Sequence, residues 1–132
     1  MMQRRRVIRS MLPLLMLALI SCAWSLNSRA QLDDSIMSFQ RALNTRQLNS
    51  ARAVCYNEPA SPLLEIVLWQ GIRDYRFIDW TSSIHGNEAR IVLDYGVTSA
   101  QSGNLFSGRQ TFAMRKFGSR WLVDLSGFAR LD

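Results

Sequence analysis

Asp79 is the residue of this sequence best placed to act as a general acid or base. It lies in the segment Tyr75–Ile84, where Tyr75, Phe77 and Asp79 occupy alternate positions. Alternate residues of a β-strand share one face, so the sequence predicts a carboxylate grouped with two aromatic rings. Apolar surroundings raise the pKa of a carboxyl group toward neutrality, as acid–base catalysis requires. Asp79 is therefore the single candidate for the chemistry of an isomerase, cyclase or hydrolase.

The same face can instead be used for binding. Tyr75, Phe77 and Asp79 are predicted to lie with Arg109 on one side of the sheet, and aromatic residues beside arginine are enriched where interfaces carry their energy. Tyr95 is predicted to point inward, where its hydroxyl could hydrogen-bond a ligand. Asp94 and Asp124 are predicted to point away from the core. Because the inward positions are mostly apolar, we favour binding over catalysis.

The sequence contains few residues that could bind a metal or a cofactor. His85 is the only histidine, and it stands beside Gly86 in a predicted turn, where a histidine is usually solvated. The sequence has neither a glycine-rich phosphate loop nor a cysteine–histidine metal spacing, so we expect no cofactor and no metal. Cys55 is interpreted as a small buried apolar side chain on a helix.

The first 30 residues are interpreted as a signal peptide and tether. Four arginines precede an apolar run over Met11–Ile20, which Pro13 interrupts and which is short for a membrane span. Leu19–Cys22 resembles a bacterial lipobox, in which Cys22 becomes the lipidated mature terminus. Ser28–Ala30 offers a second cleavage site, before Gln31. The first site predicts a lipoprotein of the periplasm or outer membrane, and the second a soluble periplasmic or secreted protein.

The net charge of +6 belongs largely to this signal. Five of the sixteen basic residues precede Gln31, so eleven basic and ten acidic residues remain in the predicted domain, residues 31–132. These charges are interspersed and form no basic stripe, which argues against nucleic-acid binding.

Helices are predicted in the first half of the domain. Asp33 or Asp34 can cap a helix in which Ile36, Phe39 and Leu43 share one face. A second helix is predicted from about Arg46 to Tyr56. Ser61–Pro62 reads as the start of a third, apolar nearly all round over Leu63–Trp69 and ended by Gly71.

After Gly71 the apolar residues alternate, and four strands are predicted. The turns between them fall at His85–Asn87, Ser99–Asn104 and Gly118–Ser119. Helices followed by hairpin-linked strands predict an α+β fold, with short N-terminal helices packed on a curled antiparallel sheet of about four strands. The proposed inward residues of the last three strands are Ala89, Ile91, Leu93, Tyr95, Val97, Phe106, Phe112, Met114, Trp121, Val123 and Leu125.

This order of elements resembles the nuclear transport factor 2-like superfamily of cone-shaped α+β domains, and in particular its small exported bacterial members. The resemblance rests on the amphipathic helix Ser35–Leu43, the long strands Tyr75–Ile84 and Ala89–Val97, and the closing turn, tryptophan and valine of Gly118–Asp124. It implies either a ligand-binding or assembly module, or a small isomerase or cyclase. Fold alone does not choose between these.

We therefore expect an exported binding or assembly module that is anchored to the membrane through Cys22. Its partner would be an envelope protein or a small hydrophobic ligand, and a homodimer is also compatible with the sequence. The alternative is a small isomerase-, cyclase- or hydrolase-like enzyme acting on a hydrophobic substrate through Asp79.

Overall fold

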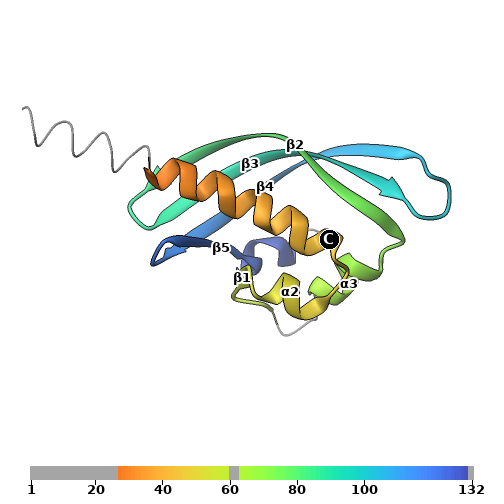
Figure 1. Ribbon diagram of the computed structural model, residues 1–132, viewed down its shortest axis with the longest axis horizontal. Coiled ribbons are helices and arrows are strands. Elements are labelled where there is room, and N and C mark those ends of the chain that lie inside the picture. The colour runs from red at the N-terminus through yellow and green to blue at the C-terminus, as the bar shows by residue number, and fades with distance from the viewer. Residues whose placement is uncertain (1–26, 60–62, 131–132) are drawn as a thin grey trace, which may run out of the picture.

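The computed structural model describes residues 27–59 and 63–130, and Figure 1 shows how they are arranged. The signal segment with Cys22, and the proposed start of the third helix at Ser61–Pro62, lie outside the described residues. Within the part of the chain that is described, no helix is both long and apolar enough to cross a membrane.

A long helix covers residues 27–44 and supplies one wall of the core. Ile36, Phe39 and Leu43 are buried along one face, as their spacing predicts. The predicted capping role of Asp33 or Asp34 is wrong, because the helix is already formed at residue 27. Asp33 instead accepts a hydrogen bond from the indole Nε1–H of Trp80 at 2.8 Å.

Two short elements follow where one helix is predicted. Arg46 has a φ of 60°, which breaks the helical path. Helix α2 then covers only Leu48–Arg52, and Cys55–Tyr56 form strand β1. Cys55 is buried as expected, but it lies on a strand rather than on a helix.

Helix α3 covers Leu63–Trp69 and buries only one side. Leu64 and Leu68 face the core, whereas Ile66 is about half exposed and Trp69 is 84% exposed. The prediction of a helix buried nearly all round is therefore wrong for these two residues. Gly71 follows at a φ of 70°, a left-handed conformation typical of the residue that ends a helix.

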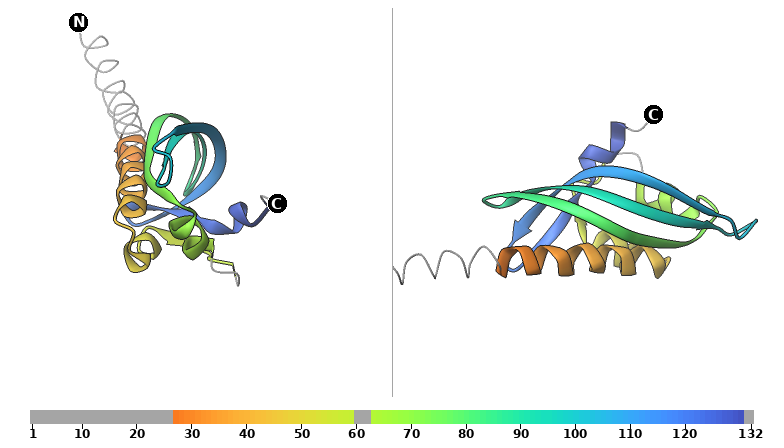
Figure 2. Two further views of the ribbon diagram at one scale, coloured as in Figure 1. Left: turned by 90° about the vertical axis from the view of Figure 1, so that its right-hand side faces the viewer. Right: turned by 90° about the horizontal axis from the view of Figure 1, so that it is seen from above.

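The sheet has five strands in the order β1-β5-β4-β3-β2. Neighbouring strands are antiparallel except β1, which runs parallel to β5. End-on, the long strands curl, and the long helix lies along one side of the curl (Figure 2). The fold is α+β, as predicted, with β1 as the strand that the sequence did not reveal. The remaining bounds are β2 Ile72–His85, β3 Glu88–Ser99, β4 Leu105–Phe117, β5 Arg120–Asp124 and a final 3-10 helix η1 Leu125–Arg130.

A β-bulge in β2 reverses the alternation halfway along the strand. Phe77 pairs with Tyr95 and Asp79 pairs with Asp94, so Ile78 is an additional residue opposite neither. Tyr75 and Phe77 are buried before the bulge, and Trp80 packs against the same core after it. One inserted residue therefore places odd-numbered and then even-numbered side chains on the inner face.

The core lies between the long helix and the inner face of the sheet. Phe39 contacts both Phe77 and Phe112, with ring centroids 5.7 and 6.2 Å apart. Trp121 and Val123 of β5 are almost fully buried, as predicted. Phe106 shares the parity of Phe112 but is 57% exposed, because the end of the β3–β4 hairpin reaches beyond the helices (Figure 1).

Candidate functional site

Tyr75 and Phe77 lie in the core rather than on a contact surface. Phe77 packs on Phe39 of the long helix. The hydroxyl of Tyr75 donates a 2.7 Å hydrogen bond to the backbone oxygen of Val67. Burial raises the pKa of Tyr75 to about 12, although the nearby charge of Arg46 opposes the shift. The Tyr75 side chain is thus uncharged at neutral pH, and its hydroxyl hydrogen is used in the bond to Val67.

Tyr95 points inward, as predicted, and packs against the core. Its ring crosses the backbone of Gly108 on β4 so closely that a β-carbon there would lie 2.7 Å from the phenolic oxygen. Any larger residue opposite Tyr95 would therefore force the ring to shift. Of the five predicted binding residues, the structure brings only Tyr75, Phe77 and Tyr95 together, on the inner face of β2 and β3.

Asp79 and Arg109 are separated from these aromatic residues. The bulge at Ile78 turns Asp79 outward, where its carboxylate accepts the backbone N–H of Trp80 at 2.9 Å. Arg109 lies on the outer face and pairs with Asp94 at 2.7 Å. The prediction that Tyr75, Phe77, Asp79 and Arg109 share one face is wrong, because a bulge cannot be seen in an alternating pattern.

The interior of the fold therefore has no carboxylate, imidazole or amine among the described residues. The buried residues that the structure describes are apolar or aromatic, apart from Thr98 and the thiol of Cys55. Burial and the nearby charge of Glu58 raise the pKa of Cys55 to about 12, so the thiolate nucleophile is suppressed. His85 is exposed at the end of β2, where it contacts Ser83. No group of three or more potential metal ligands occurs within the described ranges.

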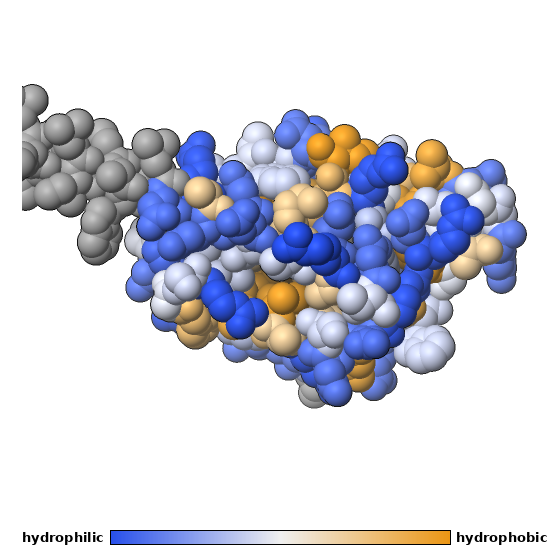
Figure 3. Space-filling model, viewed as in Figure 1, coloured by the Kyte–Doolittle hydropathy of each residue, from blue (hydrophilic) through white to orange (hydrophobic). Residues whose placement is uncertain are grey.

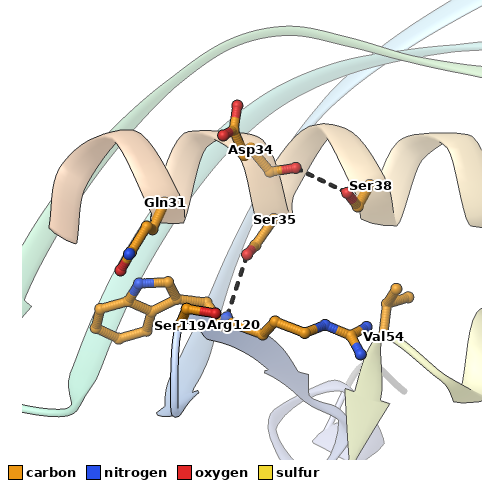
Figure 4. A pocket seen from close by; sticks show the side chains of 8 residues that line it. Gln31, Asp34, Ser35, Ser38, Val54, Ser119 and Arg120 are labelled. Atoms are coloured by element: carbon orange, nitrogen blue, oxygen red, sulfur yellow. Dashed lines mark hydrogen bonds between the residues drawn. The ribbon is translucent and has the colours of Figure 1, made fainter. Parts of the chain in front are cut away.

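A polar groove lies between the long helix and the β4–β5 turn, and it is the candidate site. Its volume is about 360 Å³, within the range of small-ligand sites. Figure 4 shows helix side chains above the groove and the residues of the turn and of β5 below them. The lining residues are Gln31, Asp34, Ser35, Ser38, Val54, Ser119, Arg120 and Trp121.

Hydrogen bonds fix the walls of this groove. Ser35 Oγ accepts the backbone N–H of Trp121 at 3.1 Å, which ties the helix to β5. Ser38 donates to the backbone oxygen of Asp34 at 2.9 Å (Figure 4). The guanidinium of Arg120 reaches the backbone oxygen of Ala53 at 3.3 Å. The site therefore has hydrogen-bonded walls, with a carboxylate on one and a guanidinium on the other.

Two polar atoms of the lining are buried without a partner among the described residues: Gln31 Oε1 and Trp121 Nε1. A buried donor or acceptor that makes no hydrogen bond lowers the stability of a protein. The groove wall therefore contains two polar atoms that do not stabilise the free protein.

A sequence signal for the groove existed. Gln31, Asp34, Ser35 and Ser38 are spaced as one helical stripe, and this stripe is polar beside the apolar one. Such a stripe usually only faces solvent, so by itself it does not predict a binding site. Its contact with Ser119 and Arg120, more than 80 residues away, appears only in the fold.

Comparison with solved structures identifies the architecture. A protein of unknown function from Mycobacterium tuberculosis, solved as a variant, matches with a TM-score of 0.62 at 14% identity, over 79% of this chain and 70% of that one. A proposed dehydratase of the NTF2-like family from Streptomyces avermitilis matches with a TM-score of 0.56 at 13% identity, over 73% of this chain and 90% of that one. This chain has the nuclear transport factor 2-like fold.

A further NTF2-like superfamily protein, from Salmonella enterica serovar Typhimurium, matches with a TM-score of 0.56 at 12% identity, over 75% of this chain and 87% of that one. Identities this low establish a shared fold and no shared chemistry. No protein-family model matches the sequence, and comparison with curated proteins finds no match. The nuclear transport factor 2-like fold includes binding modules as well as enzymes, so function must be argued from the site.

Proposed function

We propose that this nuclear transport factor 2-like domain is an exported binding or assembly module, held at a membrane surface by a lipid on Cys22. The lipobox-like Leu19–Cys22 and the basic and apolar segments before it support export and anchoring. The polar groove between the long helix and the β4–β5 turn is its recognition site. Its partner is a polar, extended segment of an envelope protein.

One observation carries the preference for binding over catalysis. In the described part of the chain, the buried side chains beneath the curled sheet are apolar or aromatic, and Asp79, the predicted base, faces outward. A general base must reach the proton that it removes within hydrogen-bonding distance. A hydrophobic substrate enclosed by the sheet would find no such group.

The chemistry of the groove indicates the kind of ligand. Asp34 and Arg120 present opposite charges, and hydroxyl groups of three serines lie between and around them. Such walls can bond both the N–H and the C=O groups of an extended peptide. An apolar ligand would leave these polar groups unpaired, which costs binding free energy.

Anchoring is tested by labelling cells with a fatty acid. The exported chain should incorporate label and fractionate with membranes, because a diacylated terminus attaches stably. Cys22→Ala should abolish both. A soluble mature protein that begins at Gln31 would overturn the anchoring half of the proposal and leave the groove untouched.

Recognition is tested by placing a photo-cross-linking amino acid at Ser119, an exposed residue of the groove. The matched control carries it at Asn87, an exposed residue of the β2–β3 turn outside the groove. We expect a discrete protein adduct from Ser119, weakened by Asp34→Lys, and none from Asn87. Equal adducts from both positions, or turnover of a substrate that Asp79→Asn abolishes, would overturn the proposal.

A further inference from the structure

One stretch of β4 has an open hydrogen-bonding edge. Strand β4 pairs with β3 over Leu105–Arg115, but it pairs with β5 only over Met114–Phe117. Among the described strands, residues 105–111 therefore have a neighbour on one side only. Within the described residues, the sole hydrogen bond to a backbone group on the other side is a 3.2 Å bond from the Gln110 side chain to the oxygen of Thr111.

The direction of the free groups follows from the register. Lys116 donates its backbone N–H toward the β3 side, to the oxygen of Asn87 at 2.8 Å. Backbone groups alternate in direction along a strand, so the N–H and C=O of Ser107 and Arg109 point away from β3. Leu105 and Phe106 are 78% and 57% exposed, so the open edge also carries apolar surface.

The opposite long edge of the sheet, on β2, is covered at its start. On β2, the amide of Asn44 bonds both backbone groups of Tyr75, at 2.8 and 2.9 Å. Gln40 accepts the backbone N–H of Phe77 at 2.6 Å, and Ile78 adds a bulge. Proteins block exposed edges with bulges, prolines or covering elements because open ones pair with other strands. Residues 105–111 have no bulge and no proline.

We infer that this edge pairs with the same edge of a second copy of the chain, antiparallel and centred on Ser107. A two-fold axis perpendicular to the sheet requires each residue to face one of equal parity. Centring on Arg109 would set two guanidinium groups directly opposite each other, which is unfavourable. Centring on Gly108 would set Phe106 opposite Gln110 and leave the two guanidinium groups diagonal neighbours. Arg109 is largely exposed, with 71% of its side chain accessible.

Centring on Ser107 removes that conflict and fits the side chains together. Leu105 then faces Arg109 of the second copy, whose aliphatic stem can cover it. Phe106 faces Gly108 of the second copy, where its ring can pack against the Tyr95 that crosses that glycine. Three outward-facing pairs give roughly six backbone hydrogen bonds, two for each pair. The pairing buries both exposed apolar residues of the edge.

Cysteine cross-linking in intact cells tests the register. Residues that face each other in a hydrogen-bonded antiparallel pair have α-carbons about 5.5 Å apart, within reach of a disulfide. With a mild thiol oxidant, Ser107→Cys should yield mostly cross-linked dimer. Thr111→Cys, on the same strand and face, should give only the wild-type background, because its two copies would lie roughly 25 Å apart. Equal cross-linking of both variants, or none from Ser107→Cys, would overturn the inference.

Sedimentation of the processed protein in detergent provides a second readout. Ser107→Pro removes one outward N–H and spares the ladder to β3, since proline is tolerated at such edge positions. It should shift the wild-type dimer to monomer, whereas Ser107→Ala should not. A monomeric wild type, or a dimeric Ser107→Pro variant that unfolds as the wild type does, would overturn self-pairing. So would cross-linking of Ser107→Cys to another protein. None of these outcomes depends on Cys22 or on the groove.

Discussion

The side-chain amide of Asn44 holds the backbone of Tyr75 at two atoms. Asn44 Nδ2 donates to the Tyr75 carbonyl at 2.9 Å, and Asn44 Oδ1 accepts the Tyr75 N–H at 2.8 Å. This is the pairing that a neighbouring strand would supply, given instead by the last turn of the long helix. The contact fixes the helix to the edge of the curled sheet.

Replacing Asn44 tests this connection. Asn44→Ala should lower the free energy of unfolding by roughly 1–3 kcal/mol, because it leaves two backbone groups of a buried residue unpaired. Asn49→Ala, at an exposed position of α2, controls for the helix propensity of asparagine and should change it by less than about 0.5 kcal/mol. Urea unfolding measures both. Equal effects would mean that the bonds to Tyr75 do not contribute.

The contact between Tyr95 and Gly108 makes a second prediction. A β-carbon at position 108 would lie 2.8 Å from the Cζ atom of Tyr95, so Gly108→Ala should destabilise the domain by about 1–3 kcal/mol. Combining it with Tyr95→Val should cost less than the sum of the single changes, because the smaller side chain removes the overlap. Additive costs in a double-mutant cycle would contradict this explanation.

Sequence patterns located most of the core but not the face of every residue. The helical stripe of Ile36, Phe39 and Leu43 and the buried Trp121 were predictable, since periodicity states which residues share a side. The bulge at Ile78 was not, because a bulge is defined by the partner strand and not by the strand itself. Every conclusion about Asp79 depended on that one residue.

Strand β1 illustrates a different limit. Cys55–Tyr56 is too short to show any alternation, and its partner on β5 lies almost 70 residues later in the chain. The candidate groove was missed for the same reason, since its two walls are distant in sequence. Periodicity within a segment shows which residues share one side of a helix or strand. A binding site depends on which of these sides come into contact in the fold.

The polar atoms buried in the groove wall predict a separation of stability from binding. Gln31→Leu should leave the free energy of unfolding unchanged or raise it by up to about 1 kcal/mol, because it removes an unpaired buried acceptor. It should also weaken the photo-adduct formed at Ser119. Gln47→Leu, at an exposed position, serves as the control. A loss of more than about 1 kcal/mol would show that Gln31 stabilises the free protein.

Cys55 should react slowly with alkylating reagents while the domain is folded. Burial raises its pKa from 9.0 to about 12, and only the thiolate reacts. Alkylation at pH 8 should be at least about 100-fold slower in buffer than in urea. The same shift makes stability decline in alkali: it is fully present below pH 9.0 and is lost as the pH rises toward about 12. A native disulfide-linked dimer through Cys55 would contradict the prediction.

Asp124 should contribute to stability above the acid range. Burial raises its pKa, but hydrogen bonds from Ser126, at 2.6 Å from the hydroxyl and 3.0 Å from the backbone, lower it below 3.8 overall. A lowered folded pKa means that the contribution is present above pH 3.8 and is lost as the pH falls through the folded value.

The test compares urea unfolding at about pH 6 and about pH 3. Ser126→Ala keeps the backbone bond to Asp124 and removes the hydroxyl, so this variant should lose less stability on acidification than the wild type does. Ser107→Ala, whose hydroxyl bonds no carboxylate among the described residues, should behave as the wild type. An unchanged acid dependence in Ser126→Ala would show that the hydroxyl does not stabilise the ionised form.

The covered start of the β2 edge has a consequence for how many molecules can join. A β-sheet that is open along both edge strands can pair with two other molecules and can grow without limit, as fibres do. Here Asn44 and Gln40 occupy the start of the β2 edge, at Tyr75 and Phe77, and the bulge follows. A strand added at that end of β2 would have to displace the long helix, so growth beyond the pair inferred for β4 is hindered there. A few side chains on one helix thus oppose polymerisation, and Asn44→Ala should promote it as well as weaken the fold.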